Sequence, residues 1–187
     1  MQIGEGVQHR YRLNGGPQWS VRSLLIVRHA KATPALVGAL DVERALSERG
    51  VAQCAQLRAW ANDPHELGRF GPVVALVSSA RRTRETFEFA FGDTPLVHEA
   101  VFSEAIYNGV RDVSGDQLLR ALGELDDGVR SLMVVAHNPS VLELLWRFSP
   151  ESARERFRTG SAYVVALAET TRVEAGVGEL VAHYAPE

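Results

Sequence analysis

The chain has 187 residues, of which 45% are hydrophobic, so it is long enough for one well-buried domain and short for two. Its net charge of -3, from 20 basic and 23 acidic residues, provides no general attraction to nucleic acid or to an anionic membrane. The single cysteine, Cys54, excludes an internal disulfide and a zinc site built on cysteines, and we expect it to serve packing only.

Residues 1–23 form a polar, glycine-containing N-terminal extension without the apolar core of a signal peptide. No segment of the chain approaches the ~18 apolar residues that a membrane span needs. We therefore expect a cytoplasmic, unanchored protein. The extension is either disordered, or a strap on the surface, or the product of an upstream start codon, and the sequence leaves these alternatives open.

Short apolar runs of the strand type alternate with helical patterns along the rest of the chain. The predicted strands are 24–27, 73–77, 96–98, 132–136, 162–167 and 179–184. Helices are predicted from the N-cap Ser47 to about residue 61, over 81–91, from the N-cap Ser114 to about residue 125, and over 141–146 after the cap Asn138 and Pro139.

This alternation predicts an α/β fold, a three-layer α/β/α sandwich with a mostly parallel sheet. The last two runs are separated by residues 170–178, which leave no room for a helix, so we expect them to form an antiparallel edge hairpin. Repeats, low-complexity tracts and interdomain linkers are absent from the sequence. Residues 24–187 are therefore predicted to form a single domain.

Chemistry-bearing side chains follow three of the apolar runs. Arg28 and His29 come directly after the first run, and His137 comes directly after the run at 132–136. Arg82 follows the run at 73–77 by a few residues, within a stretch that begins at Ser78. Because the carboxyl ends of strands in an open α/β sheet face the ligand crevice, we expect these side chains to meet at one edge.

These residue types suit phosphoryl transfer. A transferring phosphoryl group carries charge on its equatorial oxygens, so catalysis needs cations aimed at them and an in-line nucleophile. Arg28 and Arg82 can each offer a bidentate fork, and His137 can add a donor. His29 can attack phosphorus as a neutral imidazole, and water can then hydrolyse the phosphohistidine. Since the arginines supply the positive charge, no metal or other cofactor is required.

Five blocks stand in a fixed order: Arg28-His29, Asp41-Val42-Glu43-Arg44-Ala45-Leu46-Ser47-Glu48-Arg49-Gly50, Ser78 to Arg82 to Thr86, Glu104-Ala105-Ile106-Tyr107, and Val134-Val135-Ala136-His137-Asn138-Pro139. They resemble the histidine phosphatase superfamily, also called phosphoglycerate mutase-like, and within it the small SixA-type phosphohistidine phosphatases. The resemblance covers about 24–167. It implies a phosphoglycerate mutase-like fold and a metal-independent histidine phosphatase.

The resemblance also implies roles for individual residues. Glu104 is the candidate general acid and base, with Glu99 as a nearby competitor. Arg44 is either a neighbour of the phosphate or a surface cation near a helix start, and we favour the phosphate site. Of the adjacent Arg81 and Arg82, the spacing within the third block selects Arg82.

The short connections between the blocks leave no segment for a cap domain. An open site suits phosphohistidine on another protein, such as a histidine-phosphotransfer domain or a carrier protein, and this is the expected substrate. A small-molecule phosphomonoesterase is the alternative. A non-catalytic phosphate-binding protein is a third reading, which the presence of His29, Arg28, Arg82 and His137 disfavours. A mutase would need a more enclosed site. Neither nucleic acid nor a membrane is an expected partner.

Overall fold

The computed structural model describes residues 10–12, 22–107, 109, 113–125, 131–154, 156–167 and 178–186. Within these ranges one sheet has the strand order β1-β4-β3-β5-β2-β6-β7. Its strands are β1 (Arg10–Arg12), β2 (Ser23–Arg28), β3 (Val73–Ser78), β4 (Val97–Ser103), β5 (Ser131–Ala136), β6 (Ala162–Leu167) and β7 (Gly178–Tyr184).

The inner strands of the sheet run parallel to one another. β5 pairs in parallel with both β2 and β3, and β3 pairs in parallel with β4. β6 and β7 form an antiparallel hairpin on the β2 side. The predicted mostly parallel sheet with an antiparallel edge is confirmed.

The far edge of the sheet differs from the prediction. β4 continues to Ser103, well beyond the predicted 96–98. The prediction stopped short because the strand mixes apolar and charged residues and shows no clean periodicity. β1 was not predicted, since Arg10–Arg12 carry no apolar pattern. This strand forms by antiparallel pairing with the edge strand β4, which is a tertiary contact.

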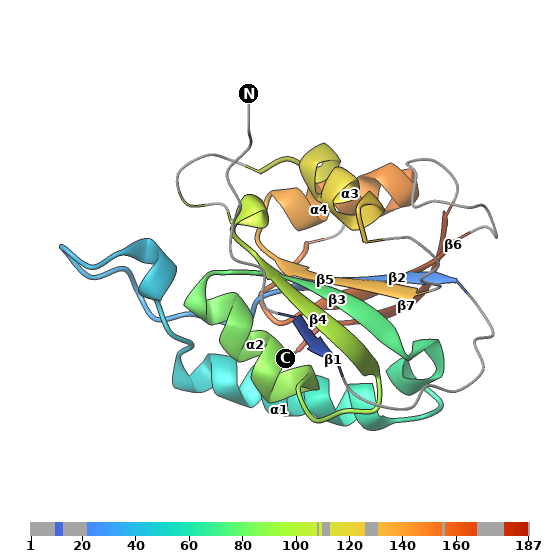
Figure 1. The fold of residues 1–187 in the computed structure, drawn as a ribbon, viewed down its shortest axis with the longest axis horizontal. Helices are drawn as coiled ribbons and strands as arrows, with labels where there is room; N and C mark the ends of the chain where they lie inside the picture. The colour runs from blue at the N-terminus through green and yellow to red at the C-terminus, as the bar shows by residue number, and fades with distance from the viewer. Residues whose placement is uncertain are drawn as a thin grey trace.

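Helices cover both faces of the sheet (Figure 1). They are α1 (Glu48–Asn62), α2 (Arg81–Phe91), α3 (Gly115–Gly123) and α4 (Ser140–Phe148), with the short 3-10 helices η1 (Asp41–Glu43), η2 (Leu67–Phe70), η3 (Glu104–Ile106) and η4 (Pro150–Arg154). α1 and α2 pack on one face, and α3 and α4 pack on the other. In the described part of the chain no helix is long and apolar enough to cross a membrane.

Two of the predicted helix caps are confirmed and one is wrong. Ser47 accepts the Gly50 N–H, and Ser114 forms a capping box with Gln117. Asn138 does not cap α4, which begins at Ser140 with Pro139 at the N-cap position and has no side-chain cap hydrogen bond. Its side-chain amide donates instead to the Phe157 carbonyl at 3.2 Å.

Side chains of the central strands point alternately to the two faces of the sheet and pack into two separate hydrophobic cores, one on each face. Leu25, Met133 and their neighbours face α1 and α2, whereas Leu24, Leu132 and their neighbours face α3 and α4. Burial on both faces explains why these strands are continuous apolar runs. Cys54 is fully buried in the first core, as predicted for a packing residue.

Gly50 brings the first turn of α1 against the chain just beyond β2. A Cβ at this position would overlap the Lys31 carbonyl oxygen, which also accepts hydrogen bonds from the Ser47 N–H at 2.8 Å and hydroxyl at 2.9 Å. Because backbone atoms cannot move aside cheaply, Gly50→Ala is expected to reduce the free energy of unfolding by about 3 kcal/mol. Urea denaturation measures this change.

The matched control is Gly123→Ala at the end of α3, where a Cβ meets open space. This variant should be as stable as the wild-type protein or slightly more stable, because alanine favours the helix. Equal urea midpoints for the two variants would show that the close contact between Gly50 and the Lys31 carbonyl does not restrict the side chain at position 50.

Candidate active site

The three strands that carry the predicted residues are neighbours in the sheet, in the order β3-β5-β2. Ser78 ends β3, His137 follows β5, and His29 follows β2. The His29 N–H donates to the Ala136 carbonyl at 3.1 Å, and the rings of His29 and His137 lie 5.1 Å apart between centroids. The strand ends therefore bring both histidines to one point on the carboxyl edge of the sheet.

The ring of His29 is held in one tautomer. Its Nδ1 lies 2.7 Å from the Ala30 carbonyl oxygen, which can only accept, so Nδ1 carries the hydrogen and Nε2 keeps a free lone pair. The Ala30 N–H in turn donates to the Thr86 hydroxyl at 2.9 Å. Burial, assisted by the charges of Arg82 and Arg28, lowers the pKa of His29 to about 3. His29 is therefore a neutral imidazole at pH 7.

His137 is also neutral and is almost entirely buried. Its Nε2 lies 2.9 Å from the Ser78 hydroxyl, and its Nδ1 has no hydrogen-bond partner among the described residues. Burial, together with the neighbouring His29 and Arg82, lowers the pKa of His137 to about 2. His137 is therefore an uncharged imidazole at pH 7, held beside His29 at the strand end.

These lowered pKa values predict a pH-dependent stability. An unfolded histidine binds a proton near pH 6.5, and the folded site resists protonation until about pH 3. The unfolded state therefore binds more protons in this window, so the stability contributed by the two neutral rings is full above pH 6.5 and is lost as the pH falls toward 3. The free energy of unfolding, from urea titrations at pH 7, 5.5 and 4, should fall along this series.

His137→Gln removes one of the two titrating rings and serves as the comparison. Its free energy of unfolding should change less with pH than that of the wild-type protein, whatever its absolute stability. Identical slopes would contradict the assignment of a suppressed protonation at His137.

Arg28 and Arg82 approach this point from different sides. Arg28 donates from Nη1 to the Phe157 carbonyl at 2.6 Å, while its buried Nε has no partner among the described residues. Arg82, in the first turn of α2, is 5% exposed. Its exposed neighbour Arg81 turns away and pairs with Glu85 at 2.7 Å. Of the two adjacent arginines, Arg82 is therefore the one that turns inward.

Asp41 in η1 joins several of these groups, and sequence analysis did not single it out. Arg82 donates from Nη1 to the Asp41 carbonyl at 2.8 Å and from Nη2 to the Asp41 carboxylate at 3.0 Å. The carboxylate also accepts from Arg44 Nη1 at 2.8 Å and from the Tyr107 hydroxyl at 2.9 Å. The only sequence signal was its place at the head of the second motif block.

Arg44 and Tyr107 complete the cluster. Arg44 donates from Nε and Nη2 to the Thr33 carbonyl at 3.0 and 2.8 Å, and its charge contributes to the lowered pKa of His29. The Tyr107 ring lies 5.8 Å from that of His137 and 5.9 Å from the Arg82 guanidinium carbon. We call His29, His137, Arg28, Arg44, Arg82, Asp41 and Tyr107 the strand-end cluster.

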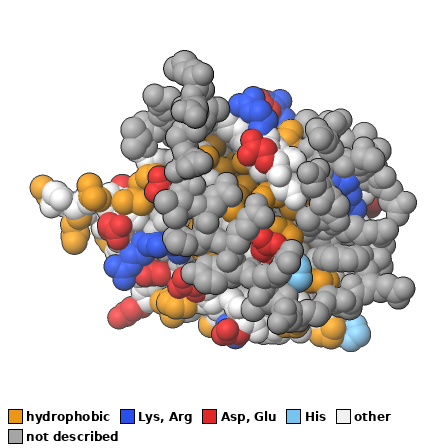
Figure 2. Space-filling model, in the orientation of Figure 1, with side chains coloured by type: hydrophobic (Ala, Val, Ile, Leu, Met, Phe, Trp, Pro, Cys, Tyr) orange, Lys and Arg blue, Asp and Glu red, His pale blue; other side chains and the backbone are white. Residues whose placement is uncertain are grey.

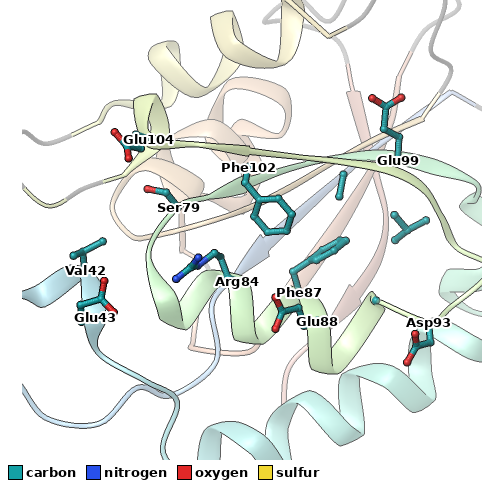
Figure 3. Close-up of a pocket in the computed structure, with 13 residues that line it drawn as sticks. Val42, Glu43, Ser79, Arg84, Phe87, Glu88, Asp93, Glu99, Phe102 and Glu104 are labelled. Atoms are coloured by element: carbon teal, nitrogen blue, oxygen red, sulfur yellow. The ribbon is translucent and has the colours of Figure 1, made fainter. Parts of the chain in front are cut away.

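Glu104 is exposed and stands beside this cluster rather than inside it. It lines a hollow of about 860 Å³ between α2 and β4, with Ser79 and Glu43 near it and Phe87 and Phe102 further in (Figure 3). The competitor Glu99 lies at the opposite end of the hollow, paired in the sheet with Val74 at the start of β3. The carboxyl edge of the sheet therefore has Glu104 near it and not Glu99.

The described residues contain no group of three or more His, Cys, Asp or Glu side chains placed to hold a metal ion. The cationic groups found at the strand-end cluster are the guanidiniums of Arg28, Arg44 and Arg82, all of which lower the pKa of His29. Around a neutral imidazole with a free Nε2, such charges form a site for an oxyanion such as a phosphoryl group.

No family model matches the sequence, and no curated protein matches it either. Solved structures do match. A chain from Agrobacterium tumefaciens assigned as the phosphohistidine phosphatase SixA has a TM-score of 0.70 and 26% identity, over 88% of this chain and 99% of that one. A chain from Nakamurella multipartitia with the same assignment has a TM-score of 0.68 and 24% identity, over 89% and 97%.

More distant members share the same architecture. A chain from Escherichia coli that is assigned as an alpha-ribazole-5'-P phosphatase has a TM-score of 0.57 and 14% identity, over 83% of this chain and 97% of that one. The predicted phosphoglycerate mutase-like fold is thus confirmed over nearly the full length of these structures. The chain therefore shares its fold with solved structures of the histidine phosphatase superfamily, the family that the order of its motif blocks resembles.

Proposed function

We propose that the protein is a metal-independent phosphatase that forms a phosphohistidine intermediate on His29 and removes phosphate from phosphohistidine on another protein. The observation that carries this proposal is the tautomer of His29, whose Nδ1 hydrogen is engaged by the Ala30 carbonyl. Its free Nε2 lies among Arg28, Arg82 and the neutral ring of His137.

The reaction has two displacement steps. In the first, the Nε2 lone pair of His29 attacks phosphorus, a P–N bond forms, and the bond to the leaving group breaks. In the second, water attacks the phosphohistidine, the P–N bond breaks, and inorganic phosphate leaves with the neutral imidazole restored. Arg28, Arg82 and Arg44 offset the charge on the phosphoryl oxygens, and His137 donates a hydrogen bond to one of them.

A protein substrate is favoured by the surface next to the strand-end cluster. The loop between β2 and η1 projects from the body at the left of Figure 1, and Figure 2 shows hydrophobic side chains along this projection. Its large apolar residues are exposed, at 72% for Leu36, 108% for Val37 and 69% for Leu40. Exposed apolar groups of this kind suit contact with a protein such as a phosphotransfer domain or a carrier, not with a small ester.

The test is phosphate release, in the presence of a chelator, from a phosphohistidine-bearing protein and from a panel of small phosphomonoesters. Turnover of the protein substrate with at least tenfold higher kcat/KM supports the proposal. Preference for small esters would replace it with a general phosphomonoesterase; the solved structure assigned as an alpha-ribazole-5'-P phosphatase is named for a small phosphate compound. No turnover of either would reject catalysis for these substrates.

Glu104→Gln is expected to separate the two substrate classes. An alkoxide needs a proton as it leaves, and Glu104 is the carboxyl group of the candidate pair that lies near the carboxyl edge of the sheet. Imidazole is a better leaving group and needs this proton less. The variant should lose about 10²-fold in kcat on phosphomonoesters and less than about fivefold on phosphohistidine.

Glu99→Gln is the matched control, because Glu99 lies in the same hollow at its far end. It should leave kcat on both substrate classes unchanged. A loss in Glu99→Gln as large as that in Glu104→Gln would contradict the assignment of Glu104 as the proton donor.

A further inference from the structure

The carboxylate of Asp41 lies between two guanidiniums that come from different parts of the chain. Arg44 is three residues away and reaches one carboxylate oxygen at 2.8 Å, whereas Arg82 belongs to α2 and reaches the other at 3.0 Å. Arg82 also binds the Asp41 carbonyl, so its fork is engaged twice by a single residue. Tyr107 from the turn after η3 adds a third donor. Asp41 thus links η1, α2 and η3.

The charge of Asp41 is constant at physiological pH. Burial raises the pKa of its carboxyl group, but hydrogen bonds from Arg44 and Tyr107 and the charge of Arg82 outweigh this effect and bring the pKa to about 2. An ionised carboxylate cannot protonate a leaving group. Any part that Asp41 plays in the reaction must therefore act through the groups it binds.

The two arginines keep donors for a second anion. A guanidinium has N–H groups on three nitrogens, and Arg82 directs only one from each terminal nitrogen at Asp41. Arg44 divides its N–H groups between Asp41 and the Thr33 carbonyl and retains others. Asp41 in η1 and the Thr33 carbonyl in the preceding loop thus fix the direction of both side chains. Each guanidinium keeps further N–H groups that can donate to a phosphoryl group.

Without an anion between them, Arg44 and Arg82 would repel each other. Arg82 is buried and belongs to a helix, but Arg44 stands at the end of the projecting loop, where its side chain is 27% exposed. A long, flexible cation in that position would turn toward water when the site is empty. The Asp41 carboxylate offsets this repulsion before any phosphoryl group is present.

We propose that Asp41 is a positioning residue that orients Arg44 and Arg82 for the phosphoryl oxygens, so that the empty site is already arranged for the transition state. The proposal rests on the phosphatase function proposed above for the same site. Donors that are fixed in advance stabilise a developing charge without reorganisation, so losing their orientation lowers kcat more than it raises KM.

The first experiment compares Asp41→Asn with Glu43→Gln, a change of the other carboxylate in η1, which is exposed. Asp41→Asn should reduce kcat/KM by about 10- to 100-fold, mainly through kcat. Glu43→Gln should match the wild-type enzyme, and Asp41→Glu, which keeps the charge, should recover part of the loss. An Asp41→Asn enzyme with wild-type kcat would overturn the proposal.

A double-mutant cycle distinguishes positioning from a general structural role. If Asp41 acts partly through Arg82, then Asp41→Asn costs less in kcat once Arg82 is alanine than it does in the wild-type enzyme, and the remaining loss is the part that acts through Arg44. Full multiplication of the two losses would show that Asp41 does not act through Arg82 and would reject that half of the proposal.

Binding of inorganic phosphate, measured by calorimetry, tests the arrangement without turnover. Asp41→Asn should bind phosphate at least about fivefold more weakly than the wild-type protein, and Glu43→Gln should bind it equally well. If the wild-type protein binds phosphate but releases none from any substrate, the proposed function fails while this comparison still stands. If Asp41→Asn binds phosphate more tightly, then Asp41 competes with the ligand and the positioning role is wrong.

Discussion

Replacing His29 by alanine is expected to lower phosphate release by about 10⁴-fold or more, to the level of the background reaction. The reason is that His29 keeps a free lone pair on Nε2 close to the charges of Arg28, Arg44 and Arg82, whereas the Nε2 of the neighbouring His137 contacts Ser78. The measurement is phosphate release, together with acid-labile labelling of the denatured protein after brief exposure to a ³²P-labelled substrate. The wild-type protein should carry this label and His29→Ala should not.

His98→Ala is a suitable control, because His98 is half-buried in β4 at the end away from the carboxyl edge. It should retain both turnover and labelling. Labelling of His29→Ala at the wild-type level would place the nucleophile elsewhere, and residual turnover within tenfold of the wild type would contradict a covalent route through His29.

Replacing Arg82 by alanine is expected to lower kcat by about 10³-fold, the second-largest effect. Its guanidinium is buried, is fixed by Asp41 and lies near enough to His29 to lower the pKa of that ring. Arg82→Lys should recover little, because an ammonium cannot provide two parallel N–H bonds to a phosphoryl group. Steady-state kinetics give kcat and KM, and urea denaturation gives the stability of each variant.

Arg81→Ala controls for the loss of a positive charge at the same helix end. Arg81 is exposed and pairs with Glu85, so the variant should keep kcat within about twofold of the wild type. Equal losses of kcat in the two variants would mean that positive charge near the start of α2, and not the directed hydrogen bonds of the Arg82 guanidinium, stabilises the transition state.

The strand-end residues could be predicted because a simple rule places them. β2, β3 and β5 are buried on both faces, so they stand out as apolar runs, and parallel strands end on the same edge. The register pairs Arg28 with Ala136, and that brings His29 and His137 into contact range. No longer-range information was needed.

Asp41 could not be found in the same way. Its partners Arg82 and Tyr107 lie 41 and 66 residues further along the chain, and the local pattern around it is that of a polar loop before a helix. β1 and the uncapped start of α4 escaped prediction for a related reason. Pairing with β4 and the hydrogen bond from Asn138 to Phe157 are tertiary contacts that local propensity does not encode.

The position of His29, the proposed nucleophile, in the sheet has a consequence for how activity is lost under stress. β2, β3 and β5 are each hydrogen-bonded on both sides, so their amides should exchange with deuterium only when the whole domain unfolds. The segment that bears Asp41 and Arg44 lies outside the sheet, between β2 and α1, so we expect it to open at a lower free energy than the strands. Mild denaturant should therefore remove Asp41 and Arg44 from the site while His29, Arg28 and Arg82 stay in place, and inactivation should precede any loss of the global fold.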